Sequence, residues 1–210
     1  MALHFYYGSG SPVAWKVWLA LEHLELPYEL HVMSFQAGDL KTPAYLAINP
    51  RHQVPAIVDE GFALYESTAI IDYLDQRYGA LWPRDPRLRA IGRRIETEAD
   101  LYVRPRIAKL LEQTLGREAQ DPAAIAEAKA AVAEELALIA SAIVGPFALG
   151  DQLSAADFAL YPHCGFLPRI DVRQPGHEAR RLAPPTLATW MARIEALPYF
   201  AKTSPPHWRA

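Results

Sequence analysis

The stretch that decides the fold is Leu3-His-Phe-Tyr-Tyr-Gly-Ser-Gly-Ser-Pro-Val13, near the start of the 210-residue chain. Its first five residues form a β-rich run, and the glycines that follow end it. From Val13 onward the apolar side chains recur at helical spacing, and Pro12 suits the first turn of a helix. The stretch therefore predicts a strand, a turn and a helix, with Ser11 as the helix N-cap.

The rest of the first 79 residues continues this alternation of short strands and helices. Asp59-Glu-Gly61 has the chemistry of a hairpin turn, and Gly79 is a typical helix stop. The remaining elements are, in order, a strand over 27–33, a short helical or irregular piece over 43–48, a hairpin over 54–64 and a helix over about 66–78. The order is βαβ followed by ββα.

The chain beyond this region reads differently, because it has no clear strand pattern. Two prolines within Leu81-Trp-Pro-Arg-Asp-Pro86 remove backbone donors and indicate a linker. Pro105 is expected to kink the helix that contains it or to mark an irregular turn. Helices are predicted over 88 to about 116, 122–145, 154 to about 165 and 185–197, with a loop over 169–184. We therefore expect one domain over 1–79, a linker over 80–87 and an all-helical domain over 88–210.

Composition and charge exclude several classes of function. Hydrophobic residues make up 51% of the chain and charged residues 21%, as in ordinary folded proteins. The 21 basic and 24 acidic side chains give a formal charge of −3 without a basic stripe, so no nucleic-acid partner is expected. The N-terminus lacks a signal-peptide pattern, and no apolar stretch is long enough to span a bilayer. We expect a cytoplasmic protein with no membrane partner.

Cysteine and histidine, which are common metal ligands, are few or scattered. The single cysteine, Cys164, leaves no Cys-x-x-Cys for redox or zinc chemistry and is interpreted as a small buried hydrophobe. The seven histidines lack the close pairing of a metal site, so we expect them at the surface or in hydrogen bonds. No metal is therefore predicted.

Three short motifs of the first domain allow a chemical interpretation beside a structural one. Ser11 is a good N-cap, yet its hydroxyl can accept from the helix and still donate to an anion. Val54-Pro55 begins a strand, and a cis bond there would expose the Val54 backbone to a peptide-like ligand. Glu66-Ser-Thr68 opens a helix whose free N–H groups suit a carboxylate, while Glu66 suits an ammonium. When each motif is taken alone, capping chemistry or an edge-strand proline is the favoured explanation.

Joined in this order and spacing, the motifs resemble the glutathione transferase family over essentially the whole chain. The matching stretches are Ser11-Pro-Val-Ala-Trp-Lys-Val17, Asn49-Pro-Arg-His-Gln-Val-Pro55, Glu66-Ser-Thr-Ala-Ile70 and Gly150-Asp-Gln-Leu-Ser-Ala-Ala-Asp157. The last contains a capping box, Ser154 with Asp157, whose role is in folding. The resemblance implies an α+β/α architecture, with a thioredoxin-like N-terminal domain followed by an all-α C-terminal helical domain.

The resemblance also implies roles for individual residues toward glutathione as co-substrate. Ser11 lies at the position of the activating serine in the serine-type classes, a group that is cytosolic and bacterial or theta/phi/tau-like. Val54, beside a cis Pro55, would pair its backbone with the cysteinyl unit. Glu66 and Ser67 would hold the γ-glutamyl head.

At the glycyl end, the resemblance implies a contact from Gln53. Many serine-type members carry histidine where this chain has Leu40. Lys41, Arg51 or His52 would then take the glycyl carboxylate.

Two other groups compete with Ser11 for activation of the thiol. Tyr6 and Tyr7 lie near the position of the activating phenol in the tyrosine-type classes, although aromatic residues at the end of a first strand usually serve packing. Ser9, between two glycines, is the other candidate. The cysteine-type classes would need a thiol at this turn, and Cys164 is far away in the sequence.

We therefore expect an enzyme that uses glutathione to transform a small apolar electrophile, and we expect it to be a homodimer. A non-catalytic glutathione transferase-like binding or regulatory protein is the alternative, because fold does not fix function. The second substrate is expected to bind between the domains. Residues that could line this pocket are Tyr7, Trp15, Tyr102, Arg106 and Phe166.

Overall fold

The computed structural model describes residues 3–116 and 120–208, which divide into two compact units. The first unit contains the described residues up to Trp82 together with those from Pro198 onward. The second unit comprises Pro83–Leu197. The sequence predicts that the helical domain runs to residue 210, whereas in the structure the C-terminal segment clusters with the first unit.

The C-terminal segment joins the first unit because its side chains complete the surroundings of Trp15. The indole Nε1 of Trp15 donates to Thr203 Oγ1 over 3.2 Å. The same ring packs against Phe200 and, edge to face, against Trp208. These partners belong to α10 (Phe200–Thr203) and to the 3-10 turn η5 (Pro206–Trp208).

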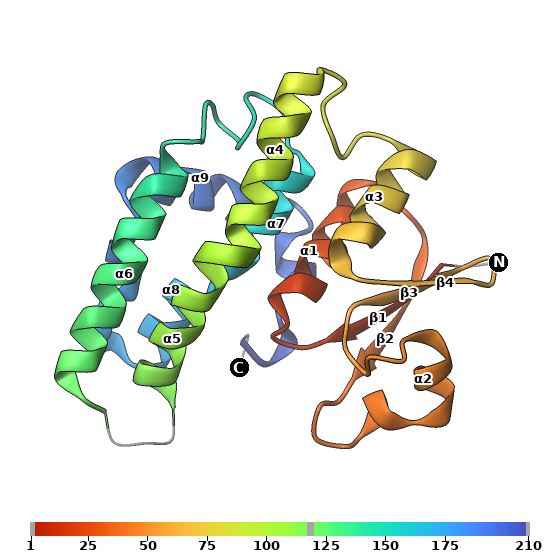
Figure 1. The fold of residues 1–210 in the computed structure, drawn as a ribbon, viewed down its shortest axis with the longest axis horizontal. Helices are drawn as coiled ribbons and strands as arrows, with labels where there is room; N and C mark the ends of the chain where they lie inside the picture. The colour runs from red at the N-terminus through yellow and green to blue at the C-terminus, as the bar shows by residue number, and fades with distance from the viewer. Residues whose placement is uncertain (1–2, 117–119, 209–210) are drawn as a thin grey trace. The chain divides into compact units, whose positions relative to one another are not determined.

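A four-stranded sheet in the order β2-β1-β3-β4 forms the centre of the first unit (Figure 1). The first strand, β1 (Leu3–Gly8), pairs in parallel with β2 (Tyr28–Met33) and antiparallel with β3 (Ala56–Asp59). The last strand, β4 (Phe62–Tyr65), pairs antiparallel with β3 across a tight turn in which Glu60 and Gly61 both have positive φ. Such a turn matches the twist of a hairpin. The expected βαβ and ββα order is confirmed.

The two faces of the sheet carry different helices because side chains alternate along β1. Phe5 and Tyr7 are fully buried and pack against Trp18 of the helix that follows β1. Tyr6 points to the other face and meets Tyr45. Figure 1 shows that helices cover both sides of the sheet. In order along the chain these are α1 (Pro12–His23), α2 (Pro43–Ile48) on the side of Tyr6, and α3 (Ser67–Tyr78) beside α1.

The second unit is helical, and its described residues form no strand apart from an isolated bridge between Phe147 and Gly150. Within residues 3–116 and 120–208, no helix is both long enough and apolar enough to cross a bilayer. The elements are α4 (Pro86–Glu98), the π-helical η2 (Ala99–Val103), α5 (Arg104–Leu115), α6 (Pro122–Ala140), α7 (Ala155–Cys164), α8 (Phe166–Arg173), the 3-10 turns η3 (Pro175–His177) and η4 (Ala179–Leu182), and α9 (Pro185–Glu195).

The long helical stretch after the linker is interrupted where the sequence predicts. The π-helical segment Ala99–Val103 ends just before Arg104, and Pro105 lies in the first turn of α5. A proline ring clashes with the carbonyl four residues earlier and cannot donate to it. The wider π turn accommodates both effects, so Pro105 explains the position of the interruption.

The prediction of a loop over 169–184 is wrong. Helix α8 occupies the start of this segment, and two 3-10 turns occupy most of the remainder. The carboxylate of Asp171 accepts the backbone N–H groups of Ala179 and Arg180, which open η4. The sequence does not indicate these turns because Pro175 and Gly176 are typical loop residues. The contact that fixes η4 comes from the side chain of Asp171, several residues earlier.

The predicted capping box at the start of α7 is confirmed, and it carries more contacts than a surface cap. Asp157 Oδ2 accepts from both the N–H and the hydroxyl of Ser154 over 2.9 Å. Its Oδ1 accepts from the Ala148 N–H over 2.7 Å and from Trp190 Nε1 over 2.8 Å. Burial raises the pKa of the Asp157 carboxyl, and these four donors oppose that rise. The carboxylate therefore joins α7, α9 and the segment before them.

Candidate functional site

The turn between β1 and α1 positions the Ser11 hydroxyl at the start of a helix. Ser11 N–H donates to the Gly8 carbonyl over 3.0 Å, and Gly10 takes the turn with a φ of +88°. Ser11 Oγ accepts from the Ala14 N–H over 3.3 Å, which confirms the predicted N-cap. That bond uses one lone pair and leaves the hydroxyl hydrogen able to donate to an anion. The positive end of the α1 dipole lies at the same place.

Gly8 brings two further side chains to this turn. A Cβ built on Gly8 would lie 2.9 Å from Val54 Cγ2 and 2.5 Å from Phe35 Cζ, so the close approach requires glycine. Val54 therefore lies against the residue that ends β1. Phe35 is 57% exposed there, and the sequence analysis did not identify it as a site residue. Its only sequence signal is an aromatic residue placed just beyond a strand.

The loop before β3 presents the backbone of Val54. The Val54-Pro55 bond is cis, as the resemblance implies. The preceding Gln53 is held by its carbonyl, which accepts from the Tyr45 hydroxyl and from Asn49 Nδ2. In residues 3–116 and 120–208, the Val54 N–H and C=O have no backbone partner. They can therefore pair with a peptide-like ligand.

The start of α3 holds Glu66 in an unusual conformation. Its φ is +71° and its ψ is 114°, outside the regions that a residue with a side chain normally occupies. Such a residue costs on the order of 1–3 kcal/mol and is found mainly at functional sites. Ser67, the first residue of the helix, is buried. A charged side chain and a helix N-terminus thus lie side by side.

Arg51 links the loop before β3 to the start of α3. Its Nε lies 3.9 Å from Glu66 Oε1, and both side chains are about two-thirds exposed, at 69% and 64%. The other two cations proposed for the glycyl carboxylate, Lys41 and His52, are exposed and form no ion pair with any described residue. Arg51 therefore lies beside the residue proposed for the γ-glutamyl head.

The C-terminal segment contributes a contact that the sequence does not predict. His207 Nδ1 lies 2.7 Å from the Ser9 hydroxyl. A Cβ on Gly10 would lie 3.1 Å from His207 Cε1, so the imidazole packs on the turn that carries Ser11. No local pattern around residue 207 indicates this neighbour.

The competing candidates for thiol activation are placed differently. The Tyr6 ring stacks on His31, and burial, with a smaller effect from the Glu29 charge, raises the pKa of its phenol. Tyr7 is fully buried against Trp18. Cys164 is completely buried, which raises the pKa of its thiol to about 12. The interpretation of Cys164 as a buried hydrophobe is therefore confirmed.

The residues expected to line a second-substrate pocket have mixed surroundings. Tyr7 and Trp15 are buried in the first unit. In the second unit Tyr102 is exposed, and Arg106 donates to its carbonyl and pairs with Glu135 over 3.3 Å. Phe166 is half-buried at the start of α8. The pocket remains a prediction.

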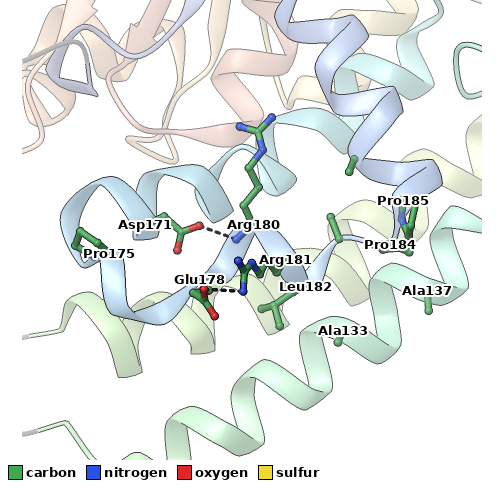
Figure 2. Close-up of a pocket in the computed structure, with 12 residues that line it drawn as sticks. Ala133, Ala137, Asp171, Pro175, Glu178, Arg180, Arg181, Leu182, Pro184 and Pro185 are labelled. Atoms are coloured by element: carbon green, nitrogen blue, oxygen red, sulfur yellow. Dashed lines mark hydrogen bonds and ion pairs between the residues drawn. The ribbon is translucent and has the colours of Figure 1, made fainter.

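A hollow of about 760 Å³ lies within the second unit, along α6 and the segment before α9 (Figure 2). Its charged side chains are already bonded: Arg181 pairs with Glu178 over 2.7 Å, and Arg180 with Glu195 over 2.8 Å. Asp171 accepts backbone N–H groups, as described above. The remaining lining is mostly alanine and proline. The hollow therefore offers no group for catalysis, and none of the predicted site residues line it.

Comparison with known proteins matches each half of the chain to one family. The model described as "Glutathione S-transferase, N-terminal domain" matches residues 10–77, and "Glutathione S-transferase, C-terminal domain" matches residues 122–193. A solved glutathione S-transferase from the Antarctic clam Laternula elliptica is 26% identical, with a TM-score of 0.84 over 100% of this chain and 94% of that one.

Two further structures give the same result. A diazinon-metabolizing glutathione S-transferase of the silkworm Bombyx mori is 27% identical, with a TM-score of 0.80 over 100% of this chain and 98% of that one. A family member from Pseudomonas fluorescens pf-5, solved with two glutathione bound, is 24% identical, with a TM-score of 0.82 over 96% of this chain and 92% of that one. At that identity the last comparison supports the fold alone.

Proposed function

Because the chain belongs to the glutathione S-transferase family, we propose that it is a glutathione transferase that forms the thiolate of glutathione for attack on a small apolar electrophile. The observation that carries the proposal is the Ser11 hydroxyl, held at the N-terminus of α1. The Val54 side chain lies against Gly8, at the start of the same turn, and the Val54 N–H and C=O have no backbone partner in the described part of the chain. A peptide paired with Val54 would thus bring its thiol toward Ser11.

The γ-glutamyl head is proposed to bind at the start of α3. Glu66 would accept from the ammonium, and the free N–H groups of the helix, with the Ser67 hydroxyl, would donate to the α-carboxylate. The positive φ of Glu66 supports this role, since a residue serving only as a cap would not need that conformation.

The glycyl end is proposed to lie near Gln53, with Lys41 or His52 donating to its carboxylate. Both side chains are exposed, so the attraction is moderate and falls as salt rises. Arg51 is a weaker candidate there because it lies beside Glu66.

Thiolate formation has a definite energetic requirement. A free thiol with a pKa of about 8.5 is mostly protonated at neutral pH, and burial alone would raise that pKa. Lowering it by roughly two units requires about 2.7 kcal/mol. One charge-assisted hydrogen bond from Ser11 and the N-terminus of α1 can supply this amount. Ser11 is thus a donor to the thiolate, and the mechanism needs no histidine base.

Activity with 1-chloro-2,4-dinitrobenzene and glutathione tests the proposal, with retention on a glutathione resin measured in parallel. Turnover that depends on glutathione supports a transferase. Retention without turnover on a panel of electrophiles would instead favour the alternative, a non-catalytic binding or regulatory protein. A homodimer and a cytoplasmic location remain predictions from the family.

The role of Ser11 is tested by ultraviolet titration of bound glutathione in three variants. Ser11→Ala should raise the pKa of the bound thiol and lower turnover by on the order of 10²-fold, with a modest loss of binding. Ser9→Ala and Tyr7→Phe are the matched controls and should change both quantities much less. If Ser11→Ala leaves the pKa unchanged while a control shifts it, the role belongs to that other residue.

A further inference from the structure

Two histidines and a glutamate meet on the face of the sheet that carries α2. His4 lies on β1 directly opposite Glu29 of β2, and His31 follows two residues later on the same strand. Side chains two residues apart on a strand share a face, so all three project to the same side. The sequence predicts no close pairing among the histidines. That expectation is wrong here, because parallel pairing joins residues 27 positions apart.

The three side chains form a compact triangle of ligand atoms. His4 Nδ1 lies 3.0 Å from His31 Nε2 and 3.4 Å from Glu29 Oε2. His31 Nε2 lies 3.5 Å from Glu29 Oε1. One nitrogen atom of each imidazole and a carboxylate oxygen thus lie within 4.8 Å of one another.

We propose that His4, Glu29 and His31 form a binding site for a divalent first-row transition metal ion, with Zn²⁺ as the reference case. Zinc bonds to imidazole nitrogen and carboxylate oxygen are about 2.0–2.1 Å long, and in a tetrahedron such bonds place neighbouring ligand atoms about 3.3 Å apart. The three separations, of which the two to Glu29 run to different carboxylate oxygens, are 3.0, 3.4 and 3.5 Å and lie close to that value. Two imidazoles and one carboxylate also match the ligand set of open zinc sites.

The surroundings of the triangle are compatible with a bound metal ion. The Tyr6 ring stacks on His31 at 4.6 Å between centroids and 14° between planes, which fixes the orientation of that imidazole. The side chains of His4, Glu29 and His31 are 35%, 60% and 30% exposed, so an ion can enter and water can fill the fourth position. Imidazole ligands select Zn²⁺, Cu²⁺ or Ni²⁺ over Mg²⁺ and Ca²⁺.

The position of the triangle indicates what the ion would do. Gly8 is four residues beyond His4 on β1, so at about 3.3 Å per residue the triangle lies about 13 Å from the Ser11 turn. A metal there would not touch the proposed thiolate. It would connect β1 to β2, which is an edge strand of the sheet. The ion would therefore stabilise the edge of the first unit and leave the chemistry unchanged.

Titration calorimetry with Zn²⁺ tests the proposal on untagged, chelator-treated protein without glutathione, whose thiol would itself bind the metal. We expect one Zn²⁺ per chain and no heat from Mg²⁺. Glu29→Gln and His31→Ala should each weaken Zn²⁺ binding at least tenfold. His177→Ala, at a histidine of the second unit, is the matched control and should bind as tightly as wild type.

Two further measurements make the result independent of calorimetry. Cobalt(II) should give the intense visible absorption of a tetrahedral ion in the wild type and lose it in His31→Ala. Zinc should raise the Tm of the wild type and of His177→Ala, but not that of His31→Ala, whose folding is checked by circular dichroism. Zinc binding that His177→Ala weakens as much as His31→Ala, or binding that neither changes, would overturn the proposal.

Discussion

The hydroxyl of Ser9 and Nδ1 of His207 lie 2.7 Å apart, although 198 residues separate them in the sequence. This contact lies at the surface, whereas the neighbouring bond from Trp15 to Thr203 is buried. The two bonds fasten the same C-terminal segment to the first unit, in different environments. Their contributions to stability should therefore differ.

Thr203→Val should lower the free energy of unfolding by about 1–3 kcal/mol, because it keeps the shape of the side chain but leaves the Trp15 N–H without its buried acceptor. Ser9→Ala removes the exposed bond and should cost less than about 1 kcal/mol. Denaturant titration of both variants measures the difference. Equal losses would mean that burial does not make the Trp15–Thr203 bond the stronger of the two.

Glu66→Gln should weaken glutathione binding by about 1.5–3 kcal/mol, because it removes the charge opposite the γ-glutamyl ammonium. Glu25→Gln is a matched control, since Glu25 is also exposed and has a positive φ of 52°. Isothermal calorimetry gives both dissociation constants. If the dissociation constant of Glu66→Gln for glutathione lies within twofold of the wild-type value, the γ-glutamyl head does not bind at the start of α3.

Glu66→Gly separates the strain at this position from its function. Glycine adopts a positive φ without a steric penalty, so the free energy of unfolding should not fall. Glutathione affinity should fall as it does in Glu66→Gln. Loss of stability together with affinity would show that Glu66 supports the fold instead.

Asp157→Ala should lower the free energy of unfolding by about 2 kcal/mol or more. The substitution leaves four buried donors without their carboxylate acceptor, among them the Ala148 N–H and Trp190 Nε1. Asp121→Ala, which removes the exposed N-cap of α6, should cost only about 1 kcal/mol. Glutathione affinity of the folded Asp157→Ala protein should stay near that of wild type. Thermal and denaturant unfolding provide the comparison.

Cys164 gives a pH dependence whose sign can be worked out. Burial raises the pKa of its thiol to about 12 from an ordinary value of 9.0, so between these values the unfolded chain releases a proton that the folded chain keeps. Stability should therefore fall as pH rises above 9, by up to about 1.4 kcal/mol per pH unit from this group. Cys164→Ala should reduce that slope in denaturant titrations. The native thiol should also react with a disulfide reagent only after unfolding.

Light scattering tests the expected homodimer. The chain mass is 23.4 kDa, so a dimer should give about twice that value at micromolar concentration. A monomer mass across that range would contradict the expectation.

Features set by neighbouring residues could be predicted from the sequence. The Ser11 N-cap, the hairpin turn at Glu60 and the capping box at Asp157 each depend on contacts within a few residues. Such local chemistry leaves a recognisable pattern in the chain. The interruption before Pro105 belongs to the same class, because proline acts on its own helix.

Features set by distant residues could not be predicted in this way. The His4–His31 pair depends on which strands lie side by side, and Phe35 reaches the site only because Gly8 leaves room for it. The order within 169–184 comes from a carboxylate eight residues before the backbone that it holds. His207 meets Ser9 after the chain has passed through the whole second unit. None of these contacts has a periodic signature.

The discontinuity of the first unit has a consequence for synthesis on the ribosome. Trp15 leaves the exit tunnel before the second unit is made, but its partners Thr203, Phe200 and Trp208 leave it only afterwards. The Trp15 ring of the nascent chain therefore lacks these three contacts while the second unit is translated. The first unit completes its core only once the segment from Pro198 onward has left the ribosome, so a chain that stopped before this segment would lose contacts in the part of the protein that was made earlier.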